Sequence, residues 1–314
     1  MAGTYWMGEC TSSYDIIERV NTALQSISWS LLESETTIYN LNTRISRCIW
    51  RGSGDGNDNV FIQMRCANEN TIELDSMVGY DSKLLFYEQP GSIQSMLYRE
   101  ERIDGTYTNL NLPVLTVAGG SEFFCWIFAD TYHVVIVTRM TTIYESAYLG
   151  LIDPIATERQ YPYPMYIAGN GVQTGGSWPS NNSGSFIFPT GGSGYVRRAD
   201  GVWRALDCPS DYPSWDTLGT IFPYNAGNYK LVDNYKETQT SAQDDLLLFP
   251  ILLQTTNPVD ILGCLHRCYW ISGVCDIGTQ DTLVLDGETY IVFDTKDYRS
   301  ANSYFVIKMI ASDD

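Results

Sequence analysis

The sequence contains few histidines and lacks the short motifs that common enzyme classes carry. Among 314 residues, only His133 and His266 are histidines. There is no phosphate-binding loop, no nucleophile elbow and no metalloprotease helix. A glycine-rich run at 191–194 is not followed by the Lys-Ser or Lys-Thr pair of a nucleotide-binding loop. These absences predict that the chain is not an enzyme and holds no cofactor and no metal.

Positive charge is also scarce. The chain has 19 basic against 37 acidic residues, a formal net charge of −18. Proteins that bind nucleic acid neutralise its phosphates with Lys and Arg, and anionic membranes attract basic segments. The densest apolar run, 246–253, is interrupted by Pro250 and is far shorter than the roughly 20 residues of a membrane span. The first residues show no basic or apolar region of a secretion signal. We therefore expect no direct nucleic-acid binding and no membrane insertion.

What the chain does have is apolar and aromatic material. Apolar residues make up 44% and charged residues 18% of the sequence, so a sizeable core is expected and disorder is not. The length suits one large β unit or two domains.

One amphipathic helix is predicted near the start, over residues 13–26. Ile16, Val20 and Leu24 recur at helical spacing. Ser12 or Ser13 can cap its first turn.

Strand signals dominate the rest of the chain. The clearest hairpins are 123–138, with a turn at Asp130, and 281–294, where Asp286 and Gly287 form a type I′ turn signal. Segment 146–151 reads as helical or extended, and 185–188 reads as a strand within an otherwise loop-like stretch at 161–201.

Together these signals predict a mainly β fold with an α+β N-terminal part, in which an N-terminal helix packs on a sheet and a β-sandwich-like region with long loops follows. The predicted organisation is an N-terminal α+β domain (1–155), a loop-rich connecting or interface region (156–245) and a C-terminal antiparallel β region (246–314).

The loop-rich region contains the candidate contact residues. Long aromatic loops in a compact protein usually cover something or meet a neighbour, and Tyr, Trp and Arg are enriched at the centres of interfaces. The predicted interface residues are Tyr161, Tyr163, Trp178, Tyr195, Arg197, Arg198 and Trp203.

The sharpest local cluster is Cys264, His266 and Cys268, followed by Cys275. On a regular strand the first three would share one face. Their spacing differs from that of common structural zinc sites, so we expect no zinc. Packed free thiols and a disulfide, for example Cys268 with Cys275, both stay open, and we expect at least one disulfide among the eight cysteines.

A catalytic Cys–His pair is conceivable between Cys125 and His133 across the first hairpin. Both lie in an apolar, aromatic ladder, which favours a packing role for each. The carboxylates form no informative motif that would suggest glycosidase chemistry.

Scattered short motifs across most of the chain resemble those of a family of virion structural proteins of tailed bacteriophages. The motifs are Gly79-Tyr80-Asp81, Glu88-Gln89-Pro90-Gly91, Ala147-Tyr148-Leu149-Gly150, Gln160-Tyr161-Pro162-Tyr163-Pro164, Leu262-Gly263, Tyr269-Trp270-Ile271-Ser272-Gly273, Asp281-Thr282-Leu283, Gly287 and Tyr290-Ile291-Val292-Phe293. The cluster of Cys264, His266, Arg267 and Cys268 departs from the pattern, where ordinary strand residues are expected.

The resemblance implies a structural component of a phage tail, at the neck or the baseplate, without a catalytic site. It would form part of a ring through contacts with copies of itself and with other phage tail proteins. It would be assembled in the host bacterial cytoplasm and reside in the virion tail. The alternative is a receptor-binding or carbohydrate-binding module at the tail tip, because aromatic loops also suit sugar stacking. A hydrolase acting on surface polysaccharide is a third possibility.

Overall fold

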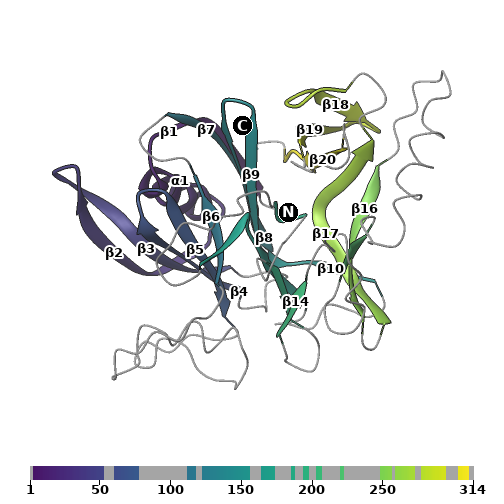
Figure 1. Ribbon diagram of the computed structural model, residues 1–314, viewed down its shortest axis with the longest axis horizontal. Helices are drawn as coiled ribbons and strands as arrows, with labels where there is room; N and C mark the ends of the chain where they lie inside the picture. Colours follow the sequence, from purple (N-terminus) through teal and green to yellow (C-terminus); the bar gives the residue numbers. More distant parts are fainter. Residues whose placement is uncertain are drawn as a thin grey trace.

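A computed structural model describes residues 3–52, 60–77, 112–117, 122–155, 164–173, 185–187, 194–197, 203–206, 220–222, 248–256, 259–272, 277–294 and 303–310 (Figure 1). Within this part the chain is mainly β, with antiparallel strand pairs and one helix, which confirms the predicted β-rich class.

The helix α1 spans Ser13–Ser26, as its apolar spacing predicts. Ser12 is the cap: its backbone is extended and its side chain accepts a hydrogen bond from the Asp15 amide at 3.3 Å. The buried face of α1 carries Ile16, Val20 and Leu24.

The strands form three sheets. The central sheet has the order β1-β7-β8-β9-β11-β13-β14. Its strands are β1 (Gly3–Cys10), β7 (Phe123–Asp130), β8 (His133–Met140), β9 (Ile143–Leu151), β11 (Met165–Ala168), β13 (Gly194–Arg197) and β14 (Trp203–Leu206).

The N-terminal sheet has the order β12-β6-β5-β4-β3-β2. Its strands are β2 (Ser30–Tyr39), β3 (Asn42–Gly52), β4 (Val60–Asn68), β5 (Thr71–Met77), β6 (Leu112–Thr116) and β12 (Gly171–Gln173).

The C-terminal sheet has the order β15-β16-β17-β20-β19-β18, and the short β10 also pairs with β17. Its strands are β10 (Asp153–Pro154), β15 (Thr220–Phe222), β16 (Phe249–Thr256), β17 (Val259–Ser272), β18 (Thr282–Leu285), β19 (Glu288–Asp294) and β20 (Ser303–Lys308).

Strands β7 and β8 of the central sheet are buried on both faces, which explains why they are almost continuously apolar in sequence. Side chains of a strand alternate between faces. In β7, Cys125 and Ile127 lie in one core cluster, whereas Trp126 and Phe128 lie in another.

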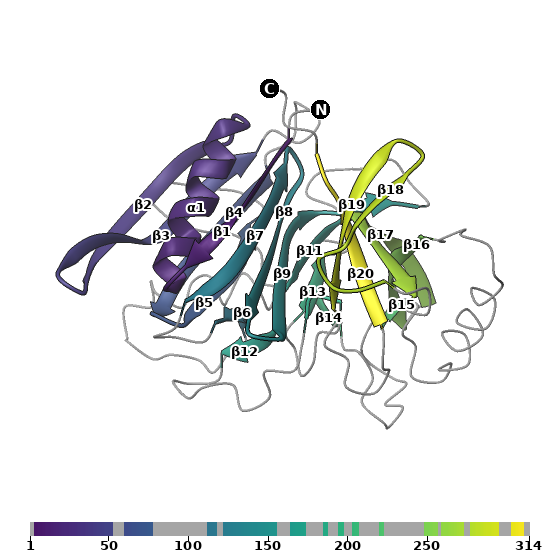
Figure 2. The ribbon, with the colours of Figure 1, turned by 90° about the horizontal axis from the view of Figure 1, so that it is seen from above.

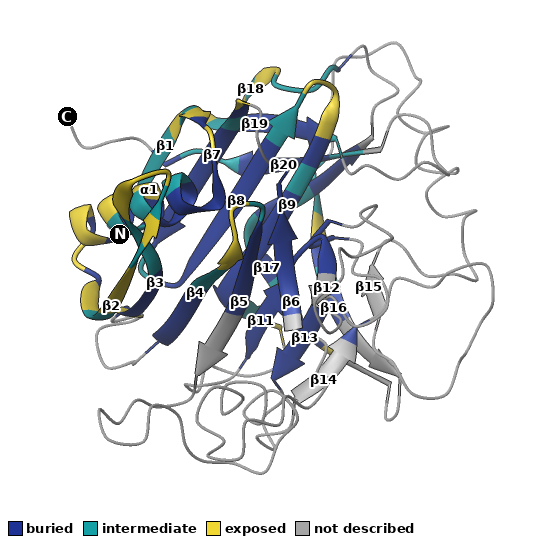
Figure 3. Cartoon of the chain, turned by 60° about the vertical axis from the view of Figure 1, so that its left-hand side comes forward, coloured by how far each residue is buried: buried dark blue, intermediate teal, exposed yellow. Residues whose placement is uncertain are grey.

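Each face of the central sheet has a different partner. Helix α1 and the N-terminal sheet share the first core cluster with it, and the C-terminal sheet shares the second. Figure 2 shows the helix on one side of the central strands and β16–β20 on the other. In Figure 3 the central strands are almost wholly buried, and exposed residues gather on α1, β2 and the hairpin ends.

The structure decides one open prediction and differs from two others. Segment 146–151 belongs to strand β9, because its alternating residues fill both cores. Residues 185–187 form a turn rather than a strand. The predicted loop region 161–201 contains strands β11, β12 and β13, which extend the central and N-terminal sheets.

In the part of the chain that the structure describes, no helix is long and apolar enough to cross a membrane.

Candidate functional site

The turn from β7 to β8 holds a fully buried carboxylate, Asp130. Its Oδ1 atom accepts hydrogen bonds from the backbone amides of Tyr132, at 2.8 Å, and His133, at 3.2 Å. The Nδ1 atom of the His133 ring lies 2.9 Å from the same oxygen. An aspartate that bonds the amides two and three residues ahead stabilises a tight turn, so this part of the site is encoded locally.

Two cationic side chains reach the other oxygen of Asp130 from β17. His266 Nε2 lies 3.1 Å and Arg267 Nε lies 3.0 Å from Oδ2. Neighbouring residues of a regular strand point to opposite faces. Here Arg267 has a φ of 59°, in the left-handed region, which breaks the alternation and brings both side chains to Asp130.

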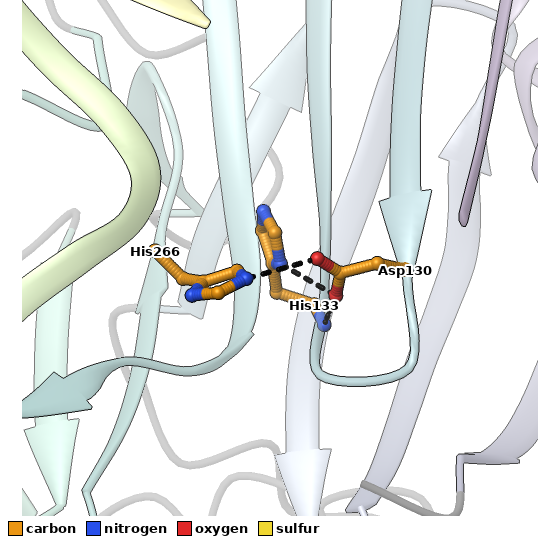
Figure 4. Close-up of side chains that lie close together, drawn as sticks. All are labelled: Asp130, His133 and His266. Atoms are coloured by element: carbon orange, nitrogen blue, oxygen red, sulfur yellow. Dashed lines mark hydrogen bonds and ion pairs between the residues drawn. The ribbon is translucent and has the colours of Figure 1, made fainter. Parts of the chain in front are cut away.

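A second carboxylate holds the far side of the His266 ring. Asp153, in β10, places Oδ2 2.7 Å from His266 Nδ1. Its strand pairs with β17, so that Asp153 lies opposite Cys264. We call Asp130, His133, Asp153, His266 and Arg267 the ion cluster; Figure 4 shows three of its members converging.

The two histidines experience opposite electrostatic environments. Burial disfavours a charge on His266, but its hydrogen bonds to Asp130 and Asp153 outweigh that effect and raise its pKa to about 8. Burial lowers the pKa of His133, and Asp130 offsets this only in part. Burial alone would raise the pKa of Asp130, but His133 and His266 hold it well below its usual value. At neutral pH the cluster therefore contains charged His266 and Arg267, two carboxylates and a neutral His133.

Aromatic side chains enclose the cluster. The His133 ring stacks on Tyr148 with centroids 5.0 Å apart, and Tyr132 meets His266 edge to face at 5.2 Å. Gly150, with a φ of 135°, lets β9 approach this turn, because a Cβ there would lie 2.3 Å from the Tyr132 carbonyl oxygen. The enclosure keeps water away from Asp130 and His133 and strengthens the interactions of Asp130.

The donor atoms of Asp130, His133 and His266 lie within 4.8 Å of one another, and two imidazoles with a carboxylate are a donor set for divalent metals. However, Arg267 Nε lies 3.2 Å from His266 Nε2 as well as 3.0 Å from Asp130 Oδ2. A transition metal about 2.0–2.2 Å from both ligands would sit against this guanidinium. His266 and Arg267 already balance the two carboxylates, so the geometry fits an internal ion-pair network better than a metal centre.

The side chains of the ion cluster form ion pairs that connect strands, and they do not form a catalytic set. Within the described part of the chain, neither imidazole bonds to a Ser, Thr or Cys side chain. Instead, the cluster joins the β7–β8 turn of the central sheet to β10 and β17 of the C-terminal sheet. Its geometry supports a structural role.

Cys125 and His133, which the sequence allows as a catalytic pair and favours as packing residues, have different partners. Cys125 lies opposite Thr138 in the β7–β8 hairpin and neighbours Cys10, whereas His133 bonds Asp130. Burial raises the pKa of the Cys125 thiol well above its usual value, which disfavours the nucleophilic thiolate.

The cysteines near His266 lie in separate environments. Cys268 is in the core, whereas Cys264 is half-buried, because the irregularity at Arg267 shifts the alternation of β17 between them. Both are free thiols, and burial raises the pKa of Cys264 to about 11. Cys275 lies outside the described residues, so a disulfide involving it stays a prediction. The expectation that 264, 266 and 268 share one face is wrong.

Few of the predicted interface residues can be placed. Tyr195 is buried in the core shared with α1 and the N-terminal sheet, and the Arg197 side chain is also buried. Trp203 begins β14, but its side chain is outside the described part. Tyr161, Tyr163, Trp178 and Arg198 lie outside the described residues.

Sequence reasoning missed Asp130 and Asp153 as partners of the histidines. The local signal for Asp130 is its position three residues before His133 at a hairpin turn. No local signal joins either carboxylate to His266, because that contact depends on how two sheets pack.

Comparison with known proteins does not identify a family for this chain. No protein-family model matches the chain, and no curated protein matches its sequence significantly.

Proposed function

We propose that this protein is a structural component of a tailed-bacteriophage virion, forming part of a ring in the tail at the neck or the baseplate. It acts through contacts with copies of itself and with other tail proteins. Its motifs resemble those of tail structural proteins, and the ion cluster is suited to stiffening a scaffold. In this proposal an N-terminal α+β part with its helix on a sheet is followed by a β-sandwich-like region with long loops.

The observation that carries the proposal is a projecting hairpin with an apolar tip. Strands β2 and β3 are joined by Asn40 and Leu41 and extend away from the body in Figures 1 and 2. The side chain of Leu41 is 98% exposed and that of Ile38 is 78% exposed. We call this hairpin the arm.

The tip of the arm is unfavourable for an isolated subunit. Both turn residues have positive φ, 48° at Asn40 and 64° at Leu41, as a type I′ turn requires. Asn and Gly adopt this conformation readily, whereas for leucine it costs about 1 kcal/mol. An exposed leucine in a strained conformation gains nothing within the monomer, and contact with another subunit would supply the missing burial.

The position of the arm suits a cyclic ring. It lies at the end of the molecule opposite β18, whose Val284 is 68% exposed (Figures 1 and 2). Contacts between unlike surfaces, repeated head to tail, close into a ring when the rotation between neighbouring subunits closes, and form a filament when it does not. We therefore assign the arm a neighbouring copy of this chain as its partner.

A complementation experiment tests the proposal. A phage lacking the gene should yield unjoined heads and tails for a neck protein, or tails without a proper end for a baseplate protein. Wild-type protein supplied in trans should restore infectivity, whereas Leu41→Asp, verified as folded by circular dichroism, should not. Normal infectious particles from the deletion would overturn the structural role. Specific binding on a glycan array, with ring assembly absent, would favour the carbohydrate-binding alternative.

A further inference from the structure

The ion cluster lies where the chain leaves the central sheet for the C-terminal sheet. Strand β9 ends at Leu151, and Asp153 already pairs with β17. His266 meets Asp153 through Nδ1 and Asp130 through Nε2, so a single ring bridges β10, β17 and the β7–β8 turn.

As ion pairs, both contacts need the imidazolium, which carries a proton on each ring nitrogen, whereas the hydrogen bond that Arg267 Nε donates to His266 Nε2, at 3.2 Å, can be accepted only by the neutral ring. Each nitrogen faces a carboxylate oxygen, and a carboxylate accepts hydrogen bonds but cannot donate them. A neutral imidazole carries one N–H. When that N–H is on Nδ1, facing Asp153, the Nε2 lone pair accepts from Arg267 Nε, and His266 no longer donates to Asp130. Oδ2 of Asp130 is buried, and its cationic contacts are His266 and Arg267, so Arg267 alone would then balance it.

We propose that protonated His266 is a latch that holds β17 against the β7–β8 turn and β10, and that loss of its proton loosens this junction while both sheets stay folded. The proposal goes beyond the structural role proposed above, since it makes the stiffness of the subunit depend on pH.

The neighbours of His266 determine the pH range in which the latch operates. Asp130 from β7 and Asp153 from β10 favour the proton, whereas Arg267 on the same strand disfavours it. His133 from β8 meets the ring edge to face at 5.1 Å and is neutral, and the Tyr148 hydroxyl of β9 accepts from the His266 amide at 3.4 Å. The two carboxylates outweigh Arg267, and the pKa of His266 is about 8. The latch is thus closed below pH 6.5 and opens as the pH rises through about 8.

The presence of only two histidines makes a direct test possible. NMR titration of the full-length chain with ¹³C-labelled histidine should show one ring titrating near pH 8, and His266→Gln should remove that signal. In Asp153→Asn the midpoint of the His266 titration should move down toward pH 6.5, because one of the two carboxylates that stabilise the charged ring is lost. Asp153 is 40% exposed in its side chain, so the variant should fold.

Hydrogen exchange measures the opening itself. Wild type and His266→Gln are compared at the same pH, so that intrinsic exchange rates cancel. Amides of β17 and of the β7–β8 turn should be better protected in the wild type at pH 6.5, and the difference should vanish by pH 9, whereas amides of α1 should not differ. A His266 midpoint at or below 6.5, a midpoint unmoved by Asp153→Asn, or equal exchange of the two proteins at every pH would overturn the latch.

Discussion

Two long hairpins of this molecule, β7–β8 and the arm β2–β3, are both antiparallel strand pairs, but the first is buried and the second is largely exposed. Both turn tightly between strands of eight or more residues. The first lies at the centre of the molecule, with both faces buried and its turn fixed by Asp130. The second projects from the edge of a sheet and ends in an exposed leucine.

The two hairpins differ in amino-acid composition in the way that their burial requires. Strands β7 and β8 are apolar at successive residues, so each face finds a partner layer. The distal half of β2 is polar, with only Ile38 exposed as a large apolar side chain there. We infer that β7–β8 maintains the fold and that the arm is available for assembly.

The largest expected effect follows removal of the carboxylate at the central turn. Asp130→Ala should destabilise the protein by about 3–5 kcal/mol, because His266 and Arg267, both partly buried, lose their shared counter-ion, the fully buried Asp130. Urea unfolding followed by tryptophan fluorescence measures the change. Leu41→Ser in the arm is the control and should unfold as the wild type does. A loss below 1 kcal/mol for Asp130→Ala would show that the cluster contributes little.

A matched pair of isoleucines tests the contrast in packing. Ile136 in β8 is fully buried, whereas Ile38 in β2 is 78% exposed. Truncation to alanine should cost about 3 kcal/mol at Ile136, through lost contacts and a cavity. The same truncation at Ile38 should stay within about 0.5 kcal/mol. Thermal unfolding of both variants, side by side, measures the difference. Equal losses of stability would contradict the conclusion that β8 is packed in the core and the arm is not.

Stability should depend on pH in opposite directions at the two histidines. The pKa of His266 is raised from 6.5 to about 8, so it contributes about 2 kcal/mol that is complete below pH 6.5 and is lost as the pH rises through 8. The pKa of His133 is lowered, so the unfolded chain binds this proton first and stability falls as the pH drops below 6.5. Unfolding free energies from pH 5 to 9 measure both slopes. In His266→Gln the slope between pH 6.5 and 8 should become shallower and the acidic slope should remain, whereas the loss toward pH 9 from the buried thiols, whose pKa values are raised, should persist.

The smallest expected effect is a gain in stability at the tip of the arm. Leu41→Gly should stabilise the isolated protein by up to about 1 kcal/mol, because glycine adopts positive φ without strain. Part of this gain is offset by the greater freedom of glycine in the unfolded chain. Under the proposed function, ring assembly followed by light scattering should weaken at the same time. If Leu41→Gly is more stable and still assembles normally, the arm does not take part in the interface between subunits.

Features with a local signal were predicted from the sequence. The spacing of Ile16, Val20 and Leu24 with a serine cap defined α1, and Asp286 with Gly287 defined the turn between β18 and β19, where both have positive φ. Segment 146–151 was ambiguous because short apolar runs fit either a helix or a strand. The strands within 161–201 were missed because they are short and separated by glycine-rich stretches.

Apart from the turn at Asp130, the ion cluster had no such signal. Arg267 has no intrinsic preference for a positive φ, so the irregularity in β17 is invisible in the sequence. Contact between Asp130 and His266 arises only once two sheets have packed face to face.

By itself, the sequence determined the β-rich class, helix α1, the β7–β8 hairpin and the negative net charge, because periodicity and composition act over a few residues. The tertiary structure alone decided which charges meet and which histidine keeps its proton. Those outcomes depend on burial and on oppositely charged groups brought together from β7, β10 and β17, and electrostatic interactions become strong only where packing has excluded water.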